Sequence, residues 1–379
     1  MKKLFYAGLA GLLLFELANV YFIMPMPGSQ RLNSIDGAYF LHTWRWTFRA
    51  VFGLMIVVGA VNAFRRSKRL SLAALVLVAV ASYAFNFRMA ADHMFYQPGR
   101  LQLRGVSENV VKPDREVLGV TVNGQVKAYP IQFIGYHHQV LDTLGGQAVM
   151  ITYCTVCRTG RVYRPIVNGR PERFRLVGMD HFNAMFEDAT TGSWWRQANG
   201  EAIAGLLKGD TLPSVFSEQM TLKRWLTLHP QSLVMQSDSN YGDRYAKLTD
   251  YERGKGSSDL TQSDSLSWRD KSWVVGLQIG THAKAYDWNR LKRDRLIHDT
   301  LANQPVLLVL APDNRSFFAY ERPGATARFS LHHDTLVNTN QAYLLTGRSL
   351  RSGPDLPRLA AHQEFWHSWR TFHAGTGRY

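Results

Sequence analysis

Cysteine is scarce in this chain, with two residues among 379, and several common catalytic motifs are absent from the sequence. It contains no P-loop, no dinucleotide-binding fingerprint and no serine-nucleophile motif, so the corresponding nucleotide-dependent and hydrolase classes have no support. Charged residues make up only 19%, and no lysine or arginine run is interleaved with aromatic side chains, so nucleic-acid binding is not expected. No stretch is low in complexity and 46% of residues are hydrophobic, which predicts a folded chain.

Long apolar runs, in contrast, are prominent near the N-terminus. Three of them cover Leu4–Met24, Phe48–Phe64 and Leu70–Phe87. Each approaches the roughly 20 residues that a helix needs to cross a bilayer core. We therefore predict three transmembrane helices over residues 1–87, with the lipid bilayer as the first partner. The first run alone also resembles a signal peptide, but two further runs do not fit a secreted chain.

Basic residues around these runs predict an orientation. Lys2 and Lys3 precede the first run, and residues 65–69 place four cations between the second and third. By the positive-inside rule both segments lie in the cytoplasm, so everything after residue 87 lies outside it. We therefore predict a multi-pass protein of the bacterial inner (cytoplasmic) membrane.

One carboxylate, Glu16, interrupts the first apolar run. An intramembrane acid is a functional candidate by default. The second run, however, begins beside Arg45 and Arg49, either of which can pair with it. We expect Glu16 to form such a pair and to serve helix packing.

The remainder of the chain repeats itself. Lys127-Ala128-Tyr129 recurs as Lys284-Ala285-Tyr286, and Asp142-Thr143-Leu144 recurs as Asp299-Thr300-Leu301, both at the same offset without a gap. The fold prediction is therefore a three-helix transmembrane segment followed by a mainly β (α+β), duplicated extracytoplasmic domain. Its parts are a first β-rich repeat (88–236), a polar linker (237–267), and a second, degenerate repeat with the C-terminal tail (268–379).

Local patterns support strands and tight turns in the first repeat. Asn123-Gly124 separates two apolar segments, which is the signal of a β-hairpin over residues 117–131. Thr221–Leu228 is predicted as a short helix that ends before His229-Pro230.

The two cysteines, Cys154 and Cys157, stand in a Cys-x-x-Cys pattern with three possible roles. A structural disulfide would close a very small ring and therefore gain little loop entropy. A thiol–disulfide oxidoreductase would need a nearby cation to favour the thiolate, and Arg158 and Arg161 could provide it. The third role is metal binding.

Metal binding requires additional ligands, because two thiolates do not complete a tetrahedral site. Imidazole and thioether groups flank the pair in the sequence, and soft sulfur combined with imidazole suits copper or zinc. The predicted ligands are Cys154, Cys157, His137 and His181, with His138 or Met179 in reserve. The second repeat has Ala311 and Asn314 where the cysteines would fall, so any such site belongs to the first repeat.

Histidines also cluster in the C-terminal tail, at His362, His367 and His373 around Trp366 and Trp369. We expect them to belong to a polar, aromatic-rich segment that packs on the domain rather than to a metal site.

Between Leu118 and about Met235 the chain resembles an uncharacterised prokaryotic family, domain-of-unknown-function family 3179. The residues that carry the resemblance are Gly119-Val120, Ala128-Tyr129-Pro130, His137, Asp142-Thr143, Gly145-Gly146, Thr152-Tyr153-Cys154, Cys157, Gly178, Asn183, Asp188, Thr191-Gly192-Ser193, Trp195, Gln197, Gly200–Gly205, Trp225 and His229-Pro230. This resemblance implies a fold unit and a candidate site at the cysteines, without naming a reaction. The family usually reads Cys-Pro-Leu-Cys-Gly at its cysteines, whereas Thr155 and Arg158 stand here.

Taken from sequence, the protein is expected to be membrane-anchored and extracytoplasmic, with copper or zinc as the candidate cofactor. A thiol–disulfide oxidoreductase is the enzyme alternative, and a structural or partner-binding module is the third. Beyond the bilayer, the expected partner is another membrane or periplasmic protein.

Overall fold

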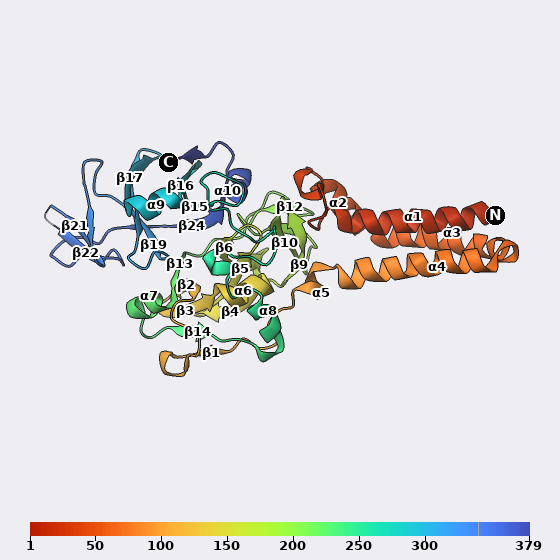
Figure 1. Cartoon of the computed structure of the whole chain (residues 1–379), viewed down its shortest axis with the longest axis horizontal. Helices are drawn as coiled ribbons and strands as arrows, with labels where there is room; N and C mark the ends of the chain where they lie inside the picture. The colour runs from red at the N-terminus through yellow and green to blue at the C-terminus, as the bar shows by residue number, and fades with distance from the viewer. Residues whose placement is uncertain (340) are drawn as a thin grey trace. The chain divides into compact units, whose positions relative to one another are not determined.

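The computed structural model describes residues 1–339 and 341–379, which form two compact units that alternate along the chain (Figure 1). The first unit consists of Met1–Tyr96, Glu172–Arg196 and Glu201–Thr211. The second consists of Gln97–Pro171, Gln197–Gly200 and Leu212–Tyr379.

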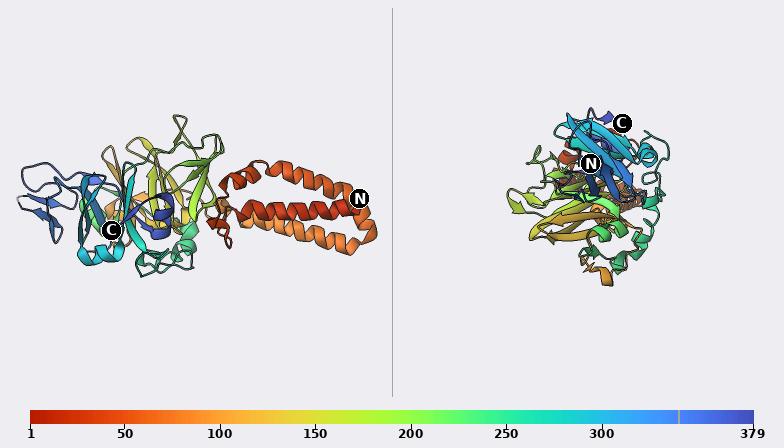
Figure 2. Two further views of the ribbon diagram at one scale, coloured as in Figure 1. Left: turned by 90° about the horizontal axis from the view of Figure 1, so that it is seen from above. Right: turned by 90° about the vertical axis from the view of Figure 1, so that its left-hand side faces the viewer.

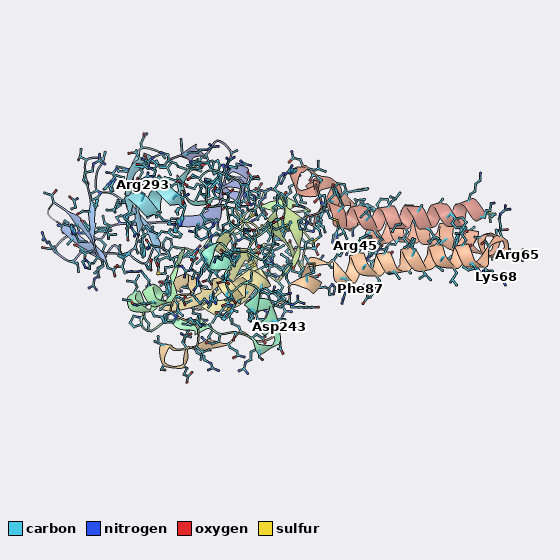
Figure 3. The ribbon with its side chains drawn as sticks, viewed as in Figure 1. Arg45, Arg65, Lys68, Phe87, Asp243 and Arg293 are labelled. Carbon is cyan, nitrogen blue, oxygen red and sulfur yellow. The ribbon has the colours of Figure 1, made fainter. Side chains whose placement is uncertain are left out.

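Three long helices begin the first unit and lie side by side (Figure 2). They are α1 (Lys2–Tyr21), α3 (Arg45–Arg66) and α4 (Lys68–Tyr83), and α4 continues into a π-helical turn, η2 (Ala84–Arg88). In the described part of the chain, these three helices are long and apolar enough to cross a membrane, which confirms the three apolar helices expected from sequence. Figure 3 shows Arg65 and Lys68 at one end of the helices, and Arg45 and Phe87 at the other.

Small residues allow α1 and α3 to pack closely. A Cβ atom added at Gly59 would lie 2.4 Å from the backbone nitrogen of Phe5, and one at Gly8 would lie 2.9 Å from the carbonyl oxygen of Phe52. Close approach through glycine is the usual packing device of helices in lipid. Behind this contact, Phe5 and Val78 contribute to a buried apolar cluster among the three helices.

The carboxylate of Glu16 is buried among these helices and fully paired. Arg49 donates from Nε to Oε1 at 2.8 Å and from Nη2 to Oε2 at 3.1 Å, and Asn86 Nδ2 donates to Oε2 at 2.9 Å. The expected pairing of Glu16 is thus confirmed for Arg49. Arg45 donates instead to the carbonyl oxygen of His42 at 2.5 Å.

An antiparallel four-stranded sheet, in the order β12-β11-β10-β9, completes the first unit together with short helices. These elements are η1 (Ser29–Arg31), α2 (Ile35–Thr43), α5 (Ala91–Met94), β9 (Phe174–Asp180), β10 (Asn183–Asp188), β11 (Trp194–Arg196) and β12 (Ala202–Ala204). The chain leaving α1 is bonded to this sheet, because Met179 N donates to Ile23 O at 2.7 Å. Gly178 permits the contact, since a Cβ atom there would lie 2.3 Å from Ile23 O.

In the second unit, a first set of elements forms two sheets, ordered β1-β14-β3-β2-β13 and β4-β5-β6, and a small β7-β8 pair. The elements are β1 (Leu103–Arg104), η3 (Val106–Glu108), β2 (Glu116–Val122), β3 (Gln125–Pro130), α6 (Ile131–His137), β4 (Gln139–Leu144), β5 (Gln147–Cys154), β6 (Thr159–Tyr163), β7 (Ile166–Val167), β8 (Arg170–Pro171), β13 (Ser217–Thr221), α7 (Leu222–Leu228) and β14 (Leu233–Met235). The hairpin at Asn123-Gly124 is confirmed, with positive φ at both residues. The helix predicted before His229 is confirmed as α7, whose N-terminus is capped by the Thr221 hydroxyl.

A second set of elements in this unit forms sheets ordered β24-β15-β16-β25, β17-β18-β19-β23 and β20-β21-β22. Its elements are β15 (Trp273–Ile279), β16 (His282–Asp287), α9 (Trp288–Asp294), β17 (Leu296–Leu301), β18 (Gln304–Leu310), β19 (Phe317–Glu321), β20 (Ser330–His332), β21 (Thr335–Asn338), β22 (Gln341–Leu344), β23 (Arg358–Leu359), β24 (Ala361–Phe365), α10 (Trp366–Phe372) and β25 (Gly377–Arg378). Between the two sets, the polar segment contains η4 (Ser239–Tyr241), α8 (Gly242–Ala246) and η5 (Tyr251–Arg253).

The two sets share particular contacts as well as element order. Lys127 Nζ and Tyr129 Oη both donate to Asp142 Oδ2, at 2.8 and 2.7 Å. Lys284 Nζ and Tyr286 Oη contact Asp299 Oδ2 in the same way, at 2.7 and 2.9 Å.

A glycine facing a buried tryptophan also occurs in each set. The indole of Trp225, on α7, covers Gly119 of β2, and the indole of Trp369, on α10, covers Gly276 of β15. In each set a strand that follows this helix pairs in parallel, β14 with β3 and β25 with β16.

Candidate functional site

The two cysteines lie on the tight turn between β5 and β6, where Cys154 pairs with Thr159 in the antiparallel register. The turn depends on Arg158, which adopts φ +55°, a left-handed conformation that glycine accepts most easily. The chain therefore keeps the tight turn with a non-glycine residue, whose strain must be offset by contacts elsewhere.

Both thiols are completely buried and neither is in a disulfide. Cys157 is hydrogen-bonded to Cys154 and to the hydroxyl of Ser368 on α10. Burial and the bond to Cys154 raise the pKa of Cys157 well above the usual thiol value, while Ser368 and the cation of Lys271 act in the opposite direction. At neutral pH, Cys157 is therefore a protonated thiol.

Two groups from distant parts of the chain contact the backbone of this turn. Lys271 Nζ donates to Val156 O at 2.7 Å, and His367 Nε2 lies 3.1 Å from the same oxygen and 3.4 Å from Lys271 Nζ. Burial lowers the pKa of Lys271, and the neighbouring cysteines and Asp270 oppose that shift. Burial, together with the Lys271 charge, lowers the pKa of His367 to about 4, so this imidazole is neutral at pH 7.

The polar segment between the two sets of elements also contacts the turn. Tyr251 Oη donates to Thr155 O at 2.9 Å, and Lys271 Nζ also donates to Leu260 O at 2.6 Å. Residues 251–271 are thus bonded directly to the cysteine turn at more than one carbonyl.

A buried polar layer continues from the turn along β6 to β24. Ser368 Oγ lies 3.2 Å from Thr159 Oγ1 and donates to Glu364 Oε2 at 2.8 Å, and Glu364 forms an ion pair with Arg161. Gln197, one of the residues that carry the family resemblance, donates to Thr159 O at 3.0 Å. The network fixes β6, and with it the C-terminal side of the cysteine turn.

Arg158 occupies a buried cage beside the cysteines. Its Nε donates to Gln363 Oε1 at 2.7 Å, and its Nη2 donates to Glu116 Oε2 and Glu252 O, both at 3.2 Å. The guanidinium carbon lies 3.7 Å from the ring centroid of Trp273, a cation–π distance. These contacts offset the strained backbone at Arg158 and connect the turn to both sets of elements.

Glu252, at the edge of this cage, makes stability depend on pH. Burial, and then the charge of Glu116, raise its pKa to about 7. Between pH 4.5 and 7 the folded protein holds a proton that the unfolded chain releases, so stability falls as pH rises through this window, by up to about 3 kcal/mol.

Glu252→Gln is expected to remove this dependence in thermal unfolding of the full chain. The exposed Glu108→Gln variant is the control, and an unchanged slope in Glu252→Gln would contradict the assignment.

The other predicted ligands have partners of their own, and His138 is bonded to Tyr153, the residue before Cys154. His137 Nε2 lies 2.7 Å from Tyr245 Oη, and His138 Nδ1 lies 2.9 Å from Tyr153 O. Burial lowers the pKa of His138 to about 4. His181 and Met179 belong to the first unit, where His181 Nδ1 lies 2.6 Å from Asp180 Oδ1.

Within residues 1–339 and 341–379, no group of three or more His, Cys, Asp or Glu side chains is placed to hold a metal ion. The metal ligands therefore stay a prediction. Sequence analysis missed Lys271 and Ser368, and it assigned His367 only to packing. A Trp-x₃-His spacing occurs both at Trp225-His229 and at Trp369-His373. This recurrence could have indicated that the C-terminal tail belongs to the second repeat.

Comparison with known proteins identifies a family. A family model described as "Protein of unknown function (DUF3179)" matches residues 102–376, which is most of the chain. The chain belongs to this family. The match extends well beyond the residues that carried the resemblance in sequence and includes the second set of elements. No curated protein and no solved structure matches the chain.

The range matched by the DUF3179 model includes parts of both compact units. The matched range contains the cysteine turn and the sheet β9–β12, to which the N-terminal helices are bonded through Ile23. Within the matched range, Arg158 is the residue that connects the cysteine turn to its surroundings.

Proposed function

We propose that this DUF3179 protein is a membrane-anchored thiol–disulfide protein in which Cys154 and Cys157 form a redox-active pair. The observation that carries the proposal is the hydrogen bond between the two thiols, on one tight turn beside the Lys271 cation. Two thiols in this contact need little movement to form a disulfide. A cation beside a thiol favours the thiolate, which is the nucleophile in thiol–disulfide exchange.

The anchor and its orientation are part of the proposal. Support comes from the three apolar helices and from the cations at Lys2, Lys3 and residues 65–69, all at the ends expected to be cytoplasmic. This orientation puts the cysteines outside the bacterial inner membrane, in a compartment where disulfides form and persist. We also infer an internal duplication, because the paired Gly–Trp and Lys–Tyr–Asp contacts follow the repeat seen in the sequence.

The proposed reaction is exchange with a disulfide on another membrane or periplasmic protein. The Cys154 thiolate would attack one sulfur of the partner disulfide, forming a mixed disulfide and releasing one partner thiolate. Cys157, after losing its proton, would then attack the Cys154 sulfur and release the second partner thiolate. The two partner thiolates take up the two protons, so the partner is reduced by two electrons and the pair becomes a disulfide.

Burial of both thiols means that the pair must first be uncovered. The segment 251–271 is the element proposed to move, which requires breaking the Tyr251 and Lys271 contacts to the turn and the hydrogen bonds from Arg158 to the Tyr251 and Glu252 carbonyls. Gly254, with φ +82°, and Gly256 interrupt this segment.

The test is equilibration of the detergent-purified full chain in glutathione buffers of graded potential, followed by unfolding, thiol alkylation and mass measurement. We expect the parent to change from two modified cysteines to none in one two-electron transition that dithiothreitol reverses. Cys154→Ser and Cys157→Ser should each keep one modifiable thiol or carry one glutathione. Two free thiols at every potential, with no mixed disulfide in either variant, would exclude the redox proposal.

Copper binding is the second candidate, favoured by Lys271. Two thiolates can hold Cu(I) without a third ligand, whereas a closed zinc site needs two more protein ligands. The positive charge of Lys271 would offset the negative charge of the bis-thiolate complex. Reduced protein that retains one Cu(I) per chain against a chelator, and loses it in Cys154→Ser and in Lys271→Met, would support this candidate over the redox pair.

A further inference from the structure

A polar cavity of about 360 Å³ lies within the first unit, between the ends of the apolar helices and the sheet β9–β12. Its volume falls within the range of about 300–1,000 Å³ that is typical of small-molecule sites. Arg45, Arg49 and Arg175 line it together with apolar residues such as Val20, Ile23 and Phe85. Figure 3 places Arg45 and Phe87 at this end of the helices.

One of the three arginines is not neutralised by an acid. Arg49 is paired with Glu16, and Arg175 is paired with Glu187 at 2.7 Å and Asp92 at 3.2 Å. Among the residues that the structure describes, no carboxylate lies within 4 Å of the Arg45 guanidinium, whose hydrogen bond goes to the His42 carbonyl. Arg45 therefore lines the cavity without a direct ion pair, and the Glu187 carboxylate acts on it only at longer range.

A second, independent observation comes from α1. The side chain of Asn19 also lines the cavity, is only 9% exposed, and its Oδ1 atom has no hydrogen-bond partner. An unsatisfied buried amide oxygen costs about 1–3 kcal/mol, so it marks a position where a ligand donor is missing. The cavity thus combines an arginine that has no direct ion pair with an amide oxygen that has no hydrogen-bond partner.

We infer that this cavity binds the headgroup of an anionic phospholipid, with the phosphate at Arg45 and a headgroup hydroxyl donating to Asn19 Oδ1. Phosphatidylglycerol has both groups. The apolar rim and the three adjoining spans favour a lipid over a soluble glycerol phosphate, because acyl chains can lie along the helices while the headgroup enters the cavity. The inference rests on the proposed membrane anchor and is independent of the cysteine chemistry.

Several hydrogen bonds fix the residues on the sheet side of the cavity. Glu187 accepts hydrogen bonds from Arg175 and from Trp194 Nε1, at 2.7 and 2.9 Å, and lies 3.1 Å from His42 Nε2. The wall contributed by the sheet is therefore preorganised, which limits the entropy lost when a headgroup binds.

Native mass spectrometry of the full chain in neutral detergent, titrated with single lipids, tests the inference. We expect phosphatidylglycerol to bind at least about tenfold more tightly than phosphatidylcholine, and Arg45→Gln to lose about tenfold in affinity, as expected for one charge-assisted hydrogen bond. Asn19→Asp, which keeps the size of the side chain but adds a negative charge, should weaken binding to a similar degree. Arg31→Gln, an exposed arginine outside the cavity lining, is the matched control.

Three results would overturn it. The first is equal retention of phosphatidylcholine by the parent, and the second is unchanged phosphatidylglycerol affinity in both Arg45→Gln and Asn19→Asp. The third is tighter binding of free glycerol 3-phosphate than of the lipid, which would assign the cavity to a soluble ligand. An error in the proposed membrane anchor would be recognised separately, because a chain without membrane helices would stay soluble without detergent.

Discussion

Replacing Arg158 with methionine is expected to destabilise the protein by about 3–5 kcal/mol, the usual cost of removing one partner from a buried ion pair. The guanidinium is completely buried, and its loss leaves the Glu116 carboxylate, itself 2% exposed, without its closest cation. Arg315 remains 3.6 Å from Glu116 and can compensate only in part. Chemical unfolding of the full chain followed by tryptophan fluorescence measures the loss.

A double variant separates the contribution of the Arg158–Glu116 ion pair to stability from that of Arg158 side-chain packing. Arg158→Met combined with Glu116→Gln removes both charges and should recover much of the stability, since the uncompensated carboxylate is then gone. Arg253→Met removes an exposed arginine that pairs with Asp114 and should cost no more than about 1 kcal/mol. If Arg158→Met lowers the free energy of unfolding no more than Arg253→Met does, the contacts of Arg158 do not stabilise the cysteine turn.

Replacing Gly119 or Gly276, the two glycines that face buried tryptophans, with alanine is expected to destabilise the protein by about 3 kcal/mol, at the upper end of overpacking effects. In Gly276→Ala the new Cβ would lie 2.1 Å from a ring carbon of Trp369, and in Gly119→Ala it would lie 2.2 Å from one of Trp225. Both indoles are buried to at least 99%, so neither can rotate away without leaving a cavity. Thermal unfolding of the two variants beside the parent measures the effect.

Gly105→Ala provides the matched control. No heavy atom lies within 4 Å of a Cβ built at Gly105, and its φ of −67° suits alanine. This variant should be neutral or slightly stabilising, because alanine restricts the unfolded chain more than glycine does. Similar stability in all three variants would show that the tryptophan contacts tolerate rearrangement and do not fix the helices on their sheets.

Much of the local structure could be predicted because its signals lie within a few residues. The apolar runs gave the three helices, Asn123-Gly124 gave a hairpin whose turn needs positive φ, and Thr221 marked the start of α7 through its capping hydroxyl. The Glu16–Arg49 pair could also be anticipated, since an acid in an apolar run has few possible partners.

The surroundings of the cysteines could not be predicted, because they are assembled from distant segments. Arg158 meets Glu116 from 42 residues before it and Gln363 from 205 residues after it, and no periodicity reports such contacts. Lys271 reaches Val156 across 115 residues. For the same reason, sequence could not indicate that residues 172–196 pack with the N-terminal helices.

The long reach of these contacts sets an order of events during synthesis. The cysteine turn obtains its last partners, Gln363, Phe365 and Ser368, only when a segment about 205 residues further along has been made. At about 5–20 residues per second this takes roughly 10–40 s. During that interval the thiols lack the contacts that enclose them. In the orientation that we propose, the pair would meet extracytoplasmic oxidants before those contacts form, so chain elongation would compete with oxidation in fixing its state.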